Sequence, residues 1–506
     1  MLKKFDVIVV GAGNAGLTAA AHASKEGLKT LLLEKHNIPG GSATSFVRGR
    51  FEFEPSLHEM AQVGSEENPG AVRQLFENLG AEVDWRHENH TYRVISTDRA
   101  EKYDASMPCG IEEFCDEMER QVPGCRESVR TLFEYGMEGL KSMSALGEGK
   151  VSPVQMFTKH TNFMRMVSHS ADECMDLIGV PKKAQHILTT YWPYVGEATD
   201  TLNCMTFCML LVVYVIYGAG MPGMFSHELS LALEKVIRNN GGKIWYNCPV
   251  TKILIKDGTA YGVVANGREY YADHIICNCF PNDVFGHMVD EKEVPTLEIQ
   301  KANAREIGLS FVTVYLGINK TAEELGIKDY SIFFEQQADS AGQYKNSFSL
   351  GGTGLIIVNC LNRVVPECTP EGTCQVFFTT SVYGDIWGKI KPEEYKKTKL
   401  RIAEEMIDYY EKTMGISLRP YIEEIEVATP ATFARYLSTP NGTPYGYQVR
   451  IWDSILPRTM NLEKELTIKG LRFCGAHSER MDGYSSAYFS GVDTAKRTIS
   501  DIKEGK

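Results

Sequence analysis

The sequence predicts an α/β protein in which a nucleotide-binding domain with a parallel sheet is interrupted by an inserted α+β domain. Three observations support this fold class. A strand–turn–helix–strand pattern with a glycine-rich turn opens the chain, three β-rich runs joined by tight turns follow residue 249, and a short strand before a long helix closes it. The chain has 506 residues, enough for two or three domains.

The opening pattern has the context that a dinucleotide-binding fingerprint requires. Residues 5–10 (FDVIVV) form a β-branched run typical of a buried parallel strand, and residues 11–16 (GAGNAG) follow it directly. A helix rich in small residues comes next, and then a second apolar strand over 30–33 that leads into Glu34. Glu34 lies 23 residues after Gly11, as expected of the acid that binds a ribose in a Rossmann-type βαβ unit.

Each glycine of this turn has a mechanical role. Gly11 permits the tight turn, Gly13 lets the backbone approach a pyrophosphate, and Gly16 allows helix and strand to pack closely. Asn14 and Ala15 lie at the predicted helix N-terminus, where free N–H groups and the positive end of the helix dipole favour phosphate. We therefore expect these five residues to bind the pyrophosphate of a dinucleotide.

Glu34 and Lys35 are expected at the ribose end of the same ligand. Glu34 can accept hydrogen bonds from ribose hydroxyl groups. Its carboxylate would repel a 2′-phosphate, so the pattern disfavours NADP.

A glycine pair after the second strand distinguishes between dinucleotides. Residues 39–45 read PGGSATS, which resembles the extended FAD signature in the PGGS form of carotenoid isomerases and retinol saturases, not the GGR form of amine oxidases. Residues 53–58 read FEPSLH and are similar to the F-D-x-G-x-H stretch of retinol saturases, with Glu54 for the usual Asp and Ser56 for Gly.

Two further segments extend the resemblance toward the C-terminus. Residues 429–437 (TPATFARYL) and 441–446 (NGTPYG) are similar to a stretch of carotenoid isomerases and retinol saturases. Residues 471–477 (LRFCGAH) and 483–487 (GYSSA) resemble the closing FAD motif. Over most of its length the chain thus resembles the phytoene desaturase, carotenoid isomerase and retinol saturase family of FAD-dependent oxidoreductases.

The resemblance implies FAD as the cofactor. Besides the N-terminal turn, it places these residues at FAD: Gly41, Ser42, Ala43, Val250, Asn278, Gly475, His477, Gly483, Tyr484 and Ser485. Val250 begins a predicted three-stranded meander, and its backbone would meet the adenine. The helix from Gly483 would direct its first amides to the flavin pyrimidine. The family's Asp that binds the ribityl chain is Ala476 here, and His477 or a backbone amide is the expected substitute.

Candidate catalytic residues are few. His58 follows the glycine-pair loop and is expected over the flavin, as a proton donor or as a shape element. Glu59 beside it is interpreted as an acid or a loop charge. Arg435 would bind a substrate carboxylate or pair with a nearby acid. Tyr484 would donate a proton or pack.

In the family that the chain resembles, hydride moves between a substrate carbon and flavin N5. The substrate is a polyene, an isoprenoid or another lipid, and the outcome is saturation, desaturation or double-bond isomerisation. The PGGSA and TPATFARYL matches favour an isomerase or a saturase over a desaturase.

A second glycine motif stands at residues 218–223 (GAGMPG), after an apolar run. It is open to interpretation as an NAD site. However, no acid ends the next predicted strand, residues 243–246, where a ribose partner would stand. We interpret the motif as the connection from the substrate domain back to the FAD domain.

The FAD-binding domain is predicted to be discontinuous. We expect residues 1–104, 220–290 and 456–506 to form it, and residues 105–219 and 291–455 to form the substrate domain. The part of the substrate domain before residue 216 is rich in Met, Phe, Tyr and Trp. Such a composition suits core packing, a long apolar pocket or a membrane-facing entrance.

Composition argues against several other classes. The formal net charge of −12 and the absence of a basic run speak against nucleic acid as a partner. The 13 cysteines form no CxxC pair and have no histidine at zinc spacing, which predicts reduced thiols and no metal site. No apolar segment reaches the ~18 residues of a membrane span. We expect a cytoplasmic enzyme that contacts the membrane surface to collect an apolar substrate and that uses a reductant or electron-transfer partner.

Two alternatives stay open at this point. A flavin amine oxidase shares the expected architecture, although Ser42 after the glycine pair departs from the GGR form. A carrier of prenylated or other lipids with the same fold and no bound FAD is the second alternative. The Ala476 departure favours that alternative, and the intact glycine turn with Glu34 speaks against it.

Overall fold

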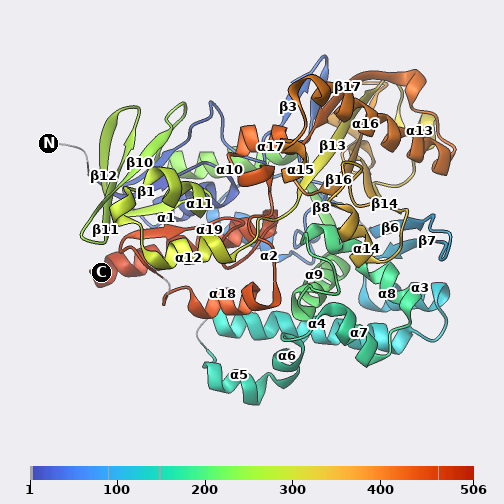
Figure 1. Ribbon diagram of the computed structural model, residues 1–506, viewed down its shortest axis with the longest axis horizontal. Helices are drawn as coiled ribbons and strands as arrows, with labels where there is room; N and C mark the ends of the chain where they lie inside the picture. Colours follow the sequence, from blue (N-terminus) through green and yellow to red (C-terminus); the bar gives the residue numbers. More distant parts are fainter. Residues whose placement is uncertain (1–3, 89, 148–149, 465, 506) are drawn as a thin grey trace.

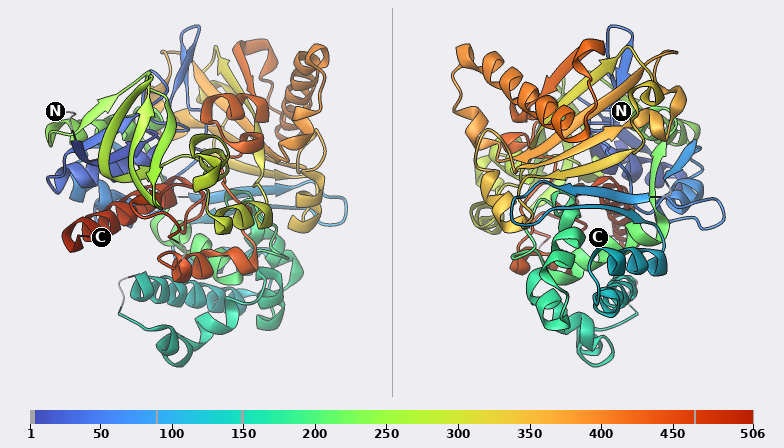
Figure 2. Two further views of the ribbon diagram at one scale, coloured as in Figure 1. Left: turned by 60° about the vertical axis from the view of Figure 1, so that its left-hand side comes forward. Right: turned by 90° about the vertical axis from the view of Figure 1, so that its right-hand side faces the viewer.

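The computed structural model describes residues 4–88, 90–147, 150–464 and 466–505. Two large sheets stand next to each other, and a group of helices lies below the second sheet (Figure 1). The first sheet contains the N-terminal strands, and the second sheet with the helical group makes up the inserted part (Figure 2). This is the mixed α/β architecture that the sequence predicts.

The first sheet has a parallel centre and an antiparallel extension. β1 pairs in parallel with β2 and β12, β2 with β9, and β12 with β18. β12 also continues beyond this centre as the third strand of a meander with β10 and β11. The strands are β1 (Lys4–Val10), β2 (Thr30–Leu33), β9 (Lys243–Trp245), β10 (Val250–Lys256), β11 (Thr259–Ala265), β12 (Arg268–Cys277) and β18 (Leu471–Phe473). The predicted parallel sheet and meander are both present.

Alternate residues of β1 face two different layers. Val7 and Val9 pack against helices, whereas Ile8 and Val10 pack on the side of the meander. The helices are α1 (Asn14–Lys25), α2 (Ala71–Leu79), α10 (Phe225–Asn239) and α19 (Tyr484–Glu504). α19 approaches α1 so closely that a Cβ at Gly491 would lie 2.3 Å from the Ala15 carbonyl oxygen. The C-terminal helix therefore reaches the glycine turn from the far end of the chain.

The second sheet has the strand order β17-β13-β16-β15-β14-β6-β7. Its strands are β6 (His90–Ser96), β7 (Tyr103–Pro108), β13 (Ser310–Ile318), β14 (Ser331–Glu335), β15 (Leu355–Cys360), β16 (Cys374–Val382) and β17 (Ile422–Ala428). β6 pairs in parallel with β14, so the expected domain boundary at residue 104 needs correction. The chain leaves the first sheet before β6, because the hydrogen-bonding partner of that strand lies in the inserted part.

A helical group completes the inserted part. Its members are α3 (Ile111–Gln121), α4 (Arg126–Gly147), α5 (Pro153–Lys159), α6 (Thr161–Met166), α7 (Ala171–Ile178), α8 (Lys182–Leu188) and α9 (Cys204–Tyr217). α9 is apolar on nearly all sides and is buried along most of its length among α3, α4, α6 and α7. The longest apolar run of the sequence is thus a core helix.

Most of the remaining helices flank the two sheets, whereas Leu456 of the helix Ile455–Asn461 packs in the core of the helical group. α16 (Pro392–Met414) packs its apolar side against the second sheet. The others are α11 (Pro281–Asp283), α12 (Thr296–Ala304), α13 (Ala322–Leu325), α14 (Ser340–Asn346), α15 (Asp385–Gly388), α17 (Pro430–Leu437) and α18 (Ile455–Asn461). Within the described ranges, no helix is long and apolar enough to cross a membrane.

The second glycine motif has a different setting from the first. It follows helix α9 rather than a strand, and its residues form β8 (Ala219–Pro222), which pairs antiparallel with β5 (Trp85–Glu88). A dinucleotide fingerprint needs a glycine turn between a parallel strand and a helix. The NAD interpretation of residues 218–223 therefore loses its structural support. The other small sheet pairs β3 (Phe46–Arg48) with β4 (Phe51–Phe53).

Candidate functional site

The carboxyl ends of three neighbouring parallel strands meet at one edge of the first sheet. Gly11 follows β1, Asn278 follows β12, and Gly475 lies just beyond β18. The Asn278 carboxamide is oriented so that both its nitrogen and its oxygen have hydrogen-bond partners. It donates to the Cys474 carbonyl (3.2 Å) and accepts from the Gly16 amide (3.3 Å). Predicted cofactor residues from three distant segments thus gather where parallel α/β sheets bind ligands.

The first turn of α1 is built for close approach of a ligand. A Cβ at Gly16 would lie 2.0 Å from the Gly11 carbonyl oxygen, and one at Gly13 would lie 2.7 Å from the end of the Asn278 carboxamide. Gly13 has no side chain to cap the helix, so it leaves the Asn14 and Ala15 amides without a side-chain cap. Asn14 Oδ1 is buried and has no hydrogen-bond partner in the described part of the chain. A backbone cradle with free amides fits the pyrophosphate of a dinucleotide.

Glu34 occupies the position predicted for the ribose partner. Its Oε2 accepts from the Ala12 amide (2.6 Å) and its Oε1 from the His36 amide (2.7 Å), so the carboxylate is fixed beside the glycine turn. The Cys248 amide donates to the Glu34 carbonyl (2.8 Å), which brings the start of β10, and with it Val250, to the same end. Lys35 contacts the Ser438 hydroxyl, just after α17.

The glycine-pair loop joins the glycine turn to the start of α19. The Gly40 amide donates to the Ala12 carbonyl (2.8 Å), and Gly41 has φ +61°, a left-handed conformation that glycine adopts without strain. The Ser42 carbonyl accepts from the Tyr484 hydroxyl (3.1 Å). Tyr484 also shares a hydrogen bond with the Ser56 hydroxyl (2.9 Å).

Two further bonds complete this arrangement. The Ala43 carbonyl accepts from Ser230 Oγ (3.0 Å), and the Ala61 carbonyl accepts from Ser485 Oγ (2.9 Å). Gly483 caps α19 without a side-chain hydrogen bond. The segment from Ser42 to Ala61 is thereby fixed against the N-terminus of α19.

The His58 side chain of this segment is buried against the second sheet. Its Nε2 shares a hydrogen bond with the Thr379 hydroxyl (3.0 Å), and its ring stacks on Phe377 at a centroid distance of 5.6 Å. Burial lowers the pKa of His58 to about 4. The imidazole is therefore neutral near pH 7, which fits a shape or hydrogen-bonding role better than that of a cationic proton donor.

Glu59 has the opposite character. Its Oε1 accepts from the Tyr194 hydroxyl (2.8 Å), whereas its Oε2 is buried and has no partner among the described residues. Burial raises the pKa of Glu59 to about 8, the charge of Glu88 raises it further, and the Tyr194 hydrogen bond opposes this shift. The raised pKa favours the protonated carboxyl near pH 7, and the Tyr194 hydroxyl holds its Oε1 in place.

The charge of a second acid, half-buried Glu88, acts on Glu59. β8 lies between the two acids, because Glu88 pairs with Ala219 and Met60 pairs with Gly220. Glu88 Oε2 also lacks a partner in the described structure, and burial followed by the charge of Asp329 raises the pKa of Glu88 to about 7. The charge of Glu88 thus adds to the effect of burial on the pKa of Glu59.

The aromatic residues around Glu59 form one continuous cluster. The Tyr194 ring stacks on Tyr191 (5.0 Å between centroids) and contacts Tyr214 (5.8 Å) and Phe333 (5.7 Å). These rings come from the 3-10 turn 189–194, α9 and β14. They make the surroundings of the Glu59 carboxyl apolar.

The structure does not bring Arg435 to this cluster. Arg435 lies on the exposed side of α17, and its guanidinium lies 6.0 Å from the ring centroid of neighbouring Tyr436. Its role in the site remains a prediction. By contrast, the segment from Ser42 to Ala61 carries His58 and Glu59, and Tyr484 begins the helix α19 beside it.

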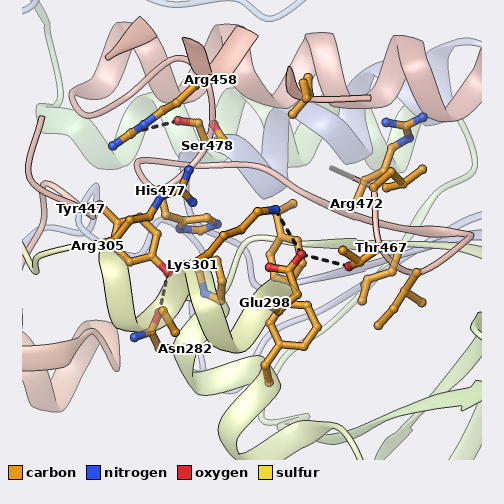
Figure 3. Close-up of a pocket in the computed structure, with 18 of the residues that line it drawn as sticks. Asn282, Glu298, Lys301, Arg305, Tyr447, Arg458, Thr467, Arg472, His477 and Ser478 are labelled. Carbon is orange, nitrogen blue, oxygen red and sulfur yellow. Dashed lines mark hydrogen bonds and ion pairs between the residues drawn. The ribbon is translucent and has the colours of Figure 1, made fainter. Parts of the chain in front are cut away.

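His477 lies in a different environment from the one expected of a ribityl ligand. Its ring is buried near Phe280 (5.8 Å) and Phe473 (6.0 Å), and burial lowers its pKa to about 3. It lines a cavity of about 310 Å³ together with Tyr447 and Arg458 (Figure 3). Its role as a substitute for the family's Asp also remains a prediction.

The charged residues of that cavity largely neutralise one another. Arg305 and Arg458 share Asp453 (3.0 and 2.9 Å), and Lys301 pairs with Glu298 (3.2 Å). Among the described residues, no group of His, Cys, Asp or Glu is placed to hold a metal ion.

Sequence reasoning missed Tyr194, Glu88 and Thr379 as site residues. Tyr194 stood in the aromatic stretch TTYWPY, for which core packing was an equally good explanation. Glu88 and Thr379 carry no motif, and only strand pairing brings them to the segment of His58 and Glu59.

Fold and site together define a Rossmann-type oxidoreductase. The family model described as "NAD(P)-binding Rossmann-like domain" matches residues 9–79. Over nearly its whole length the chain is a homologue of prolycopene isomerases and all-trans-retinol 13,14-reductases. It is 26% identical to prolycopene isomerase 2, chloroplastic, of an Oncidium hybrid cultivar, over 99% of this chain and 84% of that protein. It is 25% identical to the all-trans-retinol 13,14-reductase of Danio rerio, over 93% and 83%.

Solved structures agree on the fold. An oxidoreductase from Methanosarcina mazei superposes with a TM-score of 0.67 at 16% identity, covering 97% of this chain and 100% of that one. Putrescine oxidase bound to putrescine gives a TM-score of 0.64 at 14% identity, covering 98% and 99%. At such identities the likeness extends to the fold alone.

Proposed function

We propose that this protein is an FAD-dependent oxidoreductase that acts on C–C or C=C bonds of an apolar, lipid-like substrate. A polyene, an isoprenoid or an unsaturated fatty acid fits this description, and the reaction is a saturation, a desaturation or a double-bond isomerisation. The proposal rests mainly on one observation: the chain is related over its full length to enzymes named for a polyene and a retinoid.

The sheet edge supports FAD as the cofactor. The residues proposed to hold it are Gly11, Gly13, Asn14, Ala15, Gly16, Glu34, Lys35, Gly41, Ser42, Ala43, Val250, Asn278, Gly475, His477, Gly483, Tyr484 and Ser485. The uncapped amides of α1 suit the pyrophosphate, and those of α19 suit the flavin pyrimidine. When bound, FAD supplies hydride exchange at its N5 atom. Saturation also needs a reductant and desaturation an electron acceptor, whereas isomerisation needs neither in net terms.

Glu59 is proposed to handle the proton. In saturation, a double bond gains one hydride and one proton, and the Oε2 proton of Glu59 is available without loss of a hydrogen bond. Tyr194 positions that carboxyl, and neutral His58 shapes the neighbouring surface. The aromatic cluster excludes water from this region.

An absorbance spectrum of the purified protein tests the cofactor first. We expect flavin bands, and FAD should be identified by mass after heat release. Prolycopene and all-trans-retinol would then be incubated anaerobically with oxidised and with reduced enzyme, and the products separated by chromatography. Conversion of either compound supports the proposal, and Glu59→Gln is the control for a background reaction.

Other outcomes would favour the remaining alternatives. A colourless protein that takes up no added FAD would make the chain a carrier of the same fold. A flavoprotein that oxidises amines and leaves polyenes unchanged would make it an amine oxidase. We place the enzyme in the cytoplasm, and its apolar substrate class implies contact with a membrane surface.

A further inference from the structure

The helical hairpin α5–α6 carries two strongly exposed apolar side chains. Val154 is 74% exposed and Phe157 is 64% exposed, and they lie three residues apart on one face of α5. In both figures that show the whole molecule, α5 and α6 form one extremity (Figures 1 and 2). Isolated exposed apolar residues are common, but a pair on a protruding helix is a candidate contact surface.

The opposite face of the hairpin is well anchored. Met156 and Phe163 are buried in the core cluster of the helical group. His160 Nδ1 shares a hydrogen bond with Ser142 Oγ (2.8 Å), and Asn162 Nδ2 donates to Glu138 Oε2 (3.1 Å), both on α4. Val154 and Phe157 are therefore held outward by a fixed inner face.

The charge of this segment is opposite to that of the whole chain. Residues 150–170 contain Lys150, Lys159 and Arg165 and not one Asp or Glu, although the chain carries a net charge of −12. Lys159 and Arg165 are exposed. Acidic residues resume only with Asp172 at the start of α7. An acidic protein is repelled by an anionic surface unless one local face is basic.

We propose that the α5–α6 hairpin is the surface by which this protein docks on an anionic lipid membrane, with Val154 and Phe157 inserted among the acyl chains. Exposed apolar side chains beside lysine and arginine are the features of an interfacial helix. The basic residues attract anionic headgroups, and the long side chain of Lys159 can reach them while its methylene groups lie along the apolar boundary. The inference extends the membrane contact of the proposed function, and it stands on features that do not involve the cofactor.

The test is co-sedimentation of the full-length protein with vesicles, in the absence of substrate. One set of vesicles is phosphatidylcholine alone, and the other contains added phosphatidylserine. We expect binding to the second set, with weakening as salt is raised. The variant Val154→Glu/Phe157→Glu should bind at least about tenfold more weakly, because both apolar anchors are replaced by repelled charges. The control Val47→Glu/Leu231→Glu makes the same change in charge at two exposed apolar positions elsewhere.

A second variant protects the test against misfolding. If the first variant loses its native circular dichroism, Lys159→Glu/Arg165→Glu changes only exposed residues and should also abolish the preference for anionic vesicles. Equal binding by wild type and a folded variant would overturn the proposal, as would equal loss in the control. Failure of the wild type to bind vesicles would overturn it too and would favour a protein partner. Flavin content and turnover in detergent are measured separately, so failure here is distinct from failure of the proposed function.

Discussion

The Tyr194 hydroxyl donates to Glu59 Oε1 at 2.8 Å, while Glu59 Oε2 is buried without a partner among the described residues. Tyr194 of the inserted part thus fixes the carboxyl of Glu59, which belongs to the segment from Ser42 to Ala61 beside the start of α19. The relationship joins the two parts of the molecule through one proton-bearing group. It also leads to predictions that can be separated experimentally.

Tyr194→Phe should lower kcat/KM by about tenfold, because the carboxyl loses the bond that orients it. The Tyr194 hydrogen bond lowers the pKa of Glu59, so its removal should raise that pKa further. If the protonated carboxyl is the active form, the alkaline limb of the pH–rate profile moves to higher pH. A pH profile of kcat/KM measures both effects.

Tyr92→Phe is the matched control for this change. Tyr92 is buried in the same aromatic cluster, and its hydroxyl donates to the Ile187 carbonyl (2.8 Å) rather than to Glu59. The control should lose a similar amount of stability without a shift of the alkaline limb. A shift of equal size in both variants would mean that Tyr194 acts only through packing.

Glu59→Gln should change how stability depends on pH. The carboxyl titrates near 4.5 in the unfolded chain and near 8 in the folded one, because burial raises its pKa. Between these values the native state binds the extra proton, so the free energy of unfolding falls as pH rises. The variant lacks this proton. Between pH 4.5 and pH 8 its free energy of unfolding should therefore fall by at least about 1 kcal/mol less than that of the wild type.

Denaturant unfolding at several pH values between those limits measures the difference. Glu66→Gln, an exposed glutamate a few residues along the chain, is the control and should follow the wild-type curve. Parallel curves for wild type and Glu59→Gln would show that Glu59 is ionised in the native protein. The assignment of the proton to Oε2 would then be wrong.

Glu34→Gln should weaken FAD binding by about tenfold or more, because an uncharged amide leaves one acceptor fewer for the Ala12 and His36 amides and for ribose. Titration of the cofactor-free protein with FAD, followed by flavin fluorescence, measures the Kd. Glu26→Gln, on an exposed position just after α1, serves as the control. Unchanged affinity in Glu34→Gln would place the ribose elsewhere.

Arg435→Ala should change the free energy of unfolding by less than about 0.5 kcal/mol, because the side chain is exposed and lies against the neighbouring Tyr436 ring. With a hydrocarbon polyene, kcat should equal that of wild type. Steady-state kinetics with such a substrate and with a carboxylate-bearing lipid decide the role of the residue. A tenfold loss of kcat with the hydrocarbon would restore Arg435 to the catalytic residues.

The N-terminal strand–turn–helix unit, the meander and the closing helix were predictable from the sequence, because each is specified by residues close together in the chain. The glycine turn, α1, β2 and Glu34 follow from a strand–turn–helix pattern with fixed spacing, and all lie where expected. The meander and the closing strand and helix were equally visible, since turn dipeptides and helical periodicity act over a few residues.

Tertiary structure decided which distant segments share a sheet or a site. β6 and β7 joined the second sheet because β14, more than 200 residues later, supplies the pairing edge. Likewise, Tyr194 and Glu88 reach Glu59 only through packing across β8 and α9, and no spacing along the chain encodes such contacts. The protonation of Glu59 also follows from burial, which depends on the whole fold. The sequence by itself therefore determined the nucleotide-binding edge, and the fold determined the environment of the proton beside it.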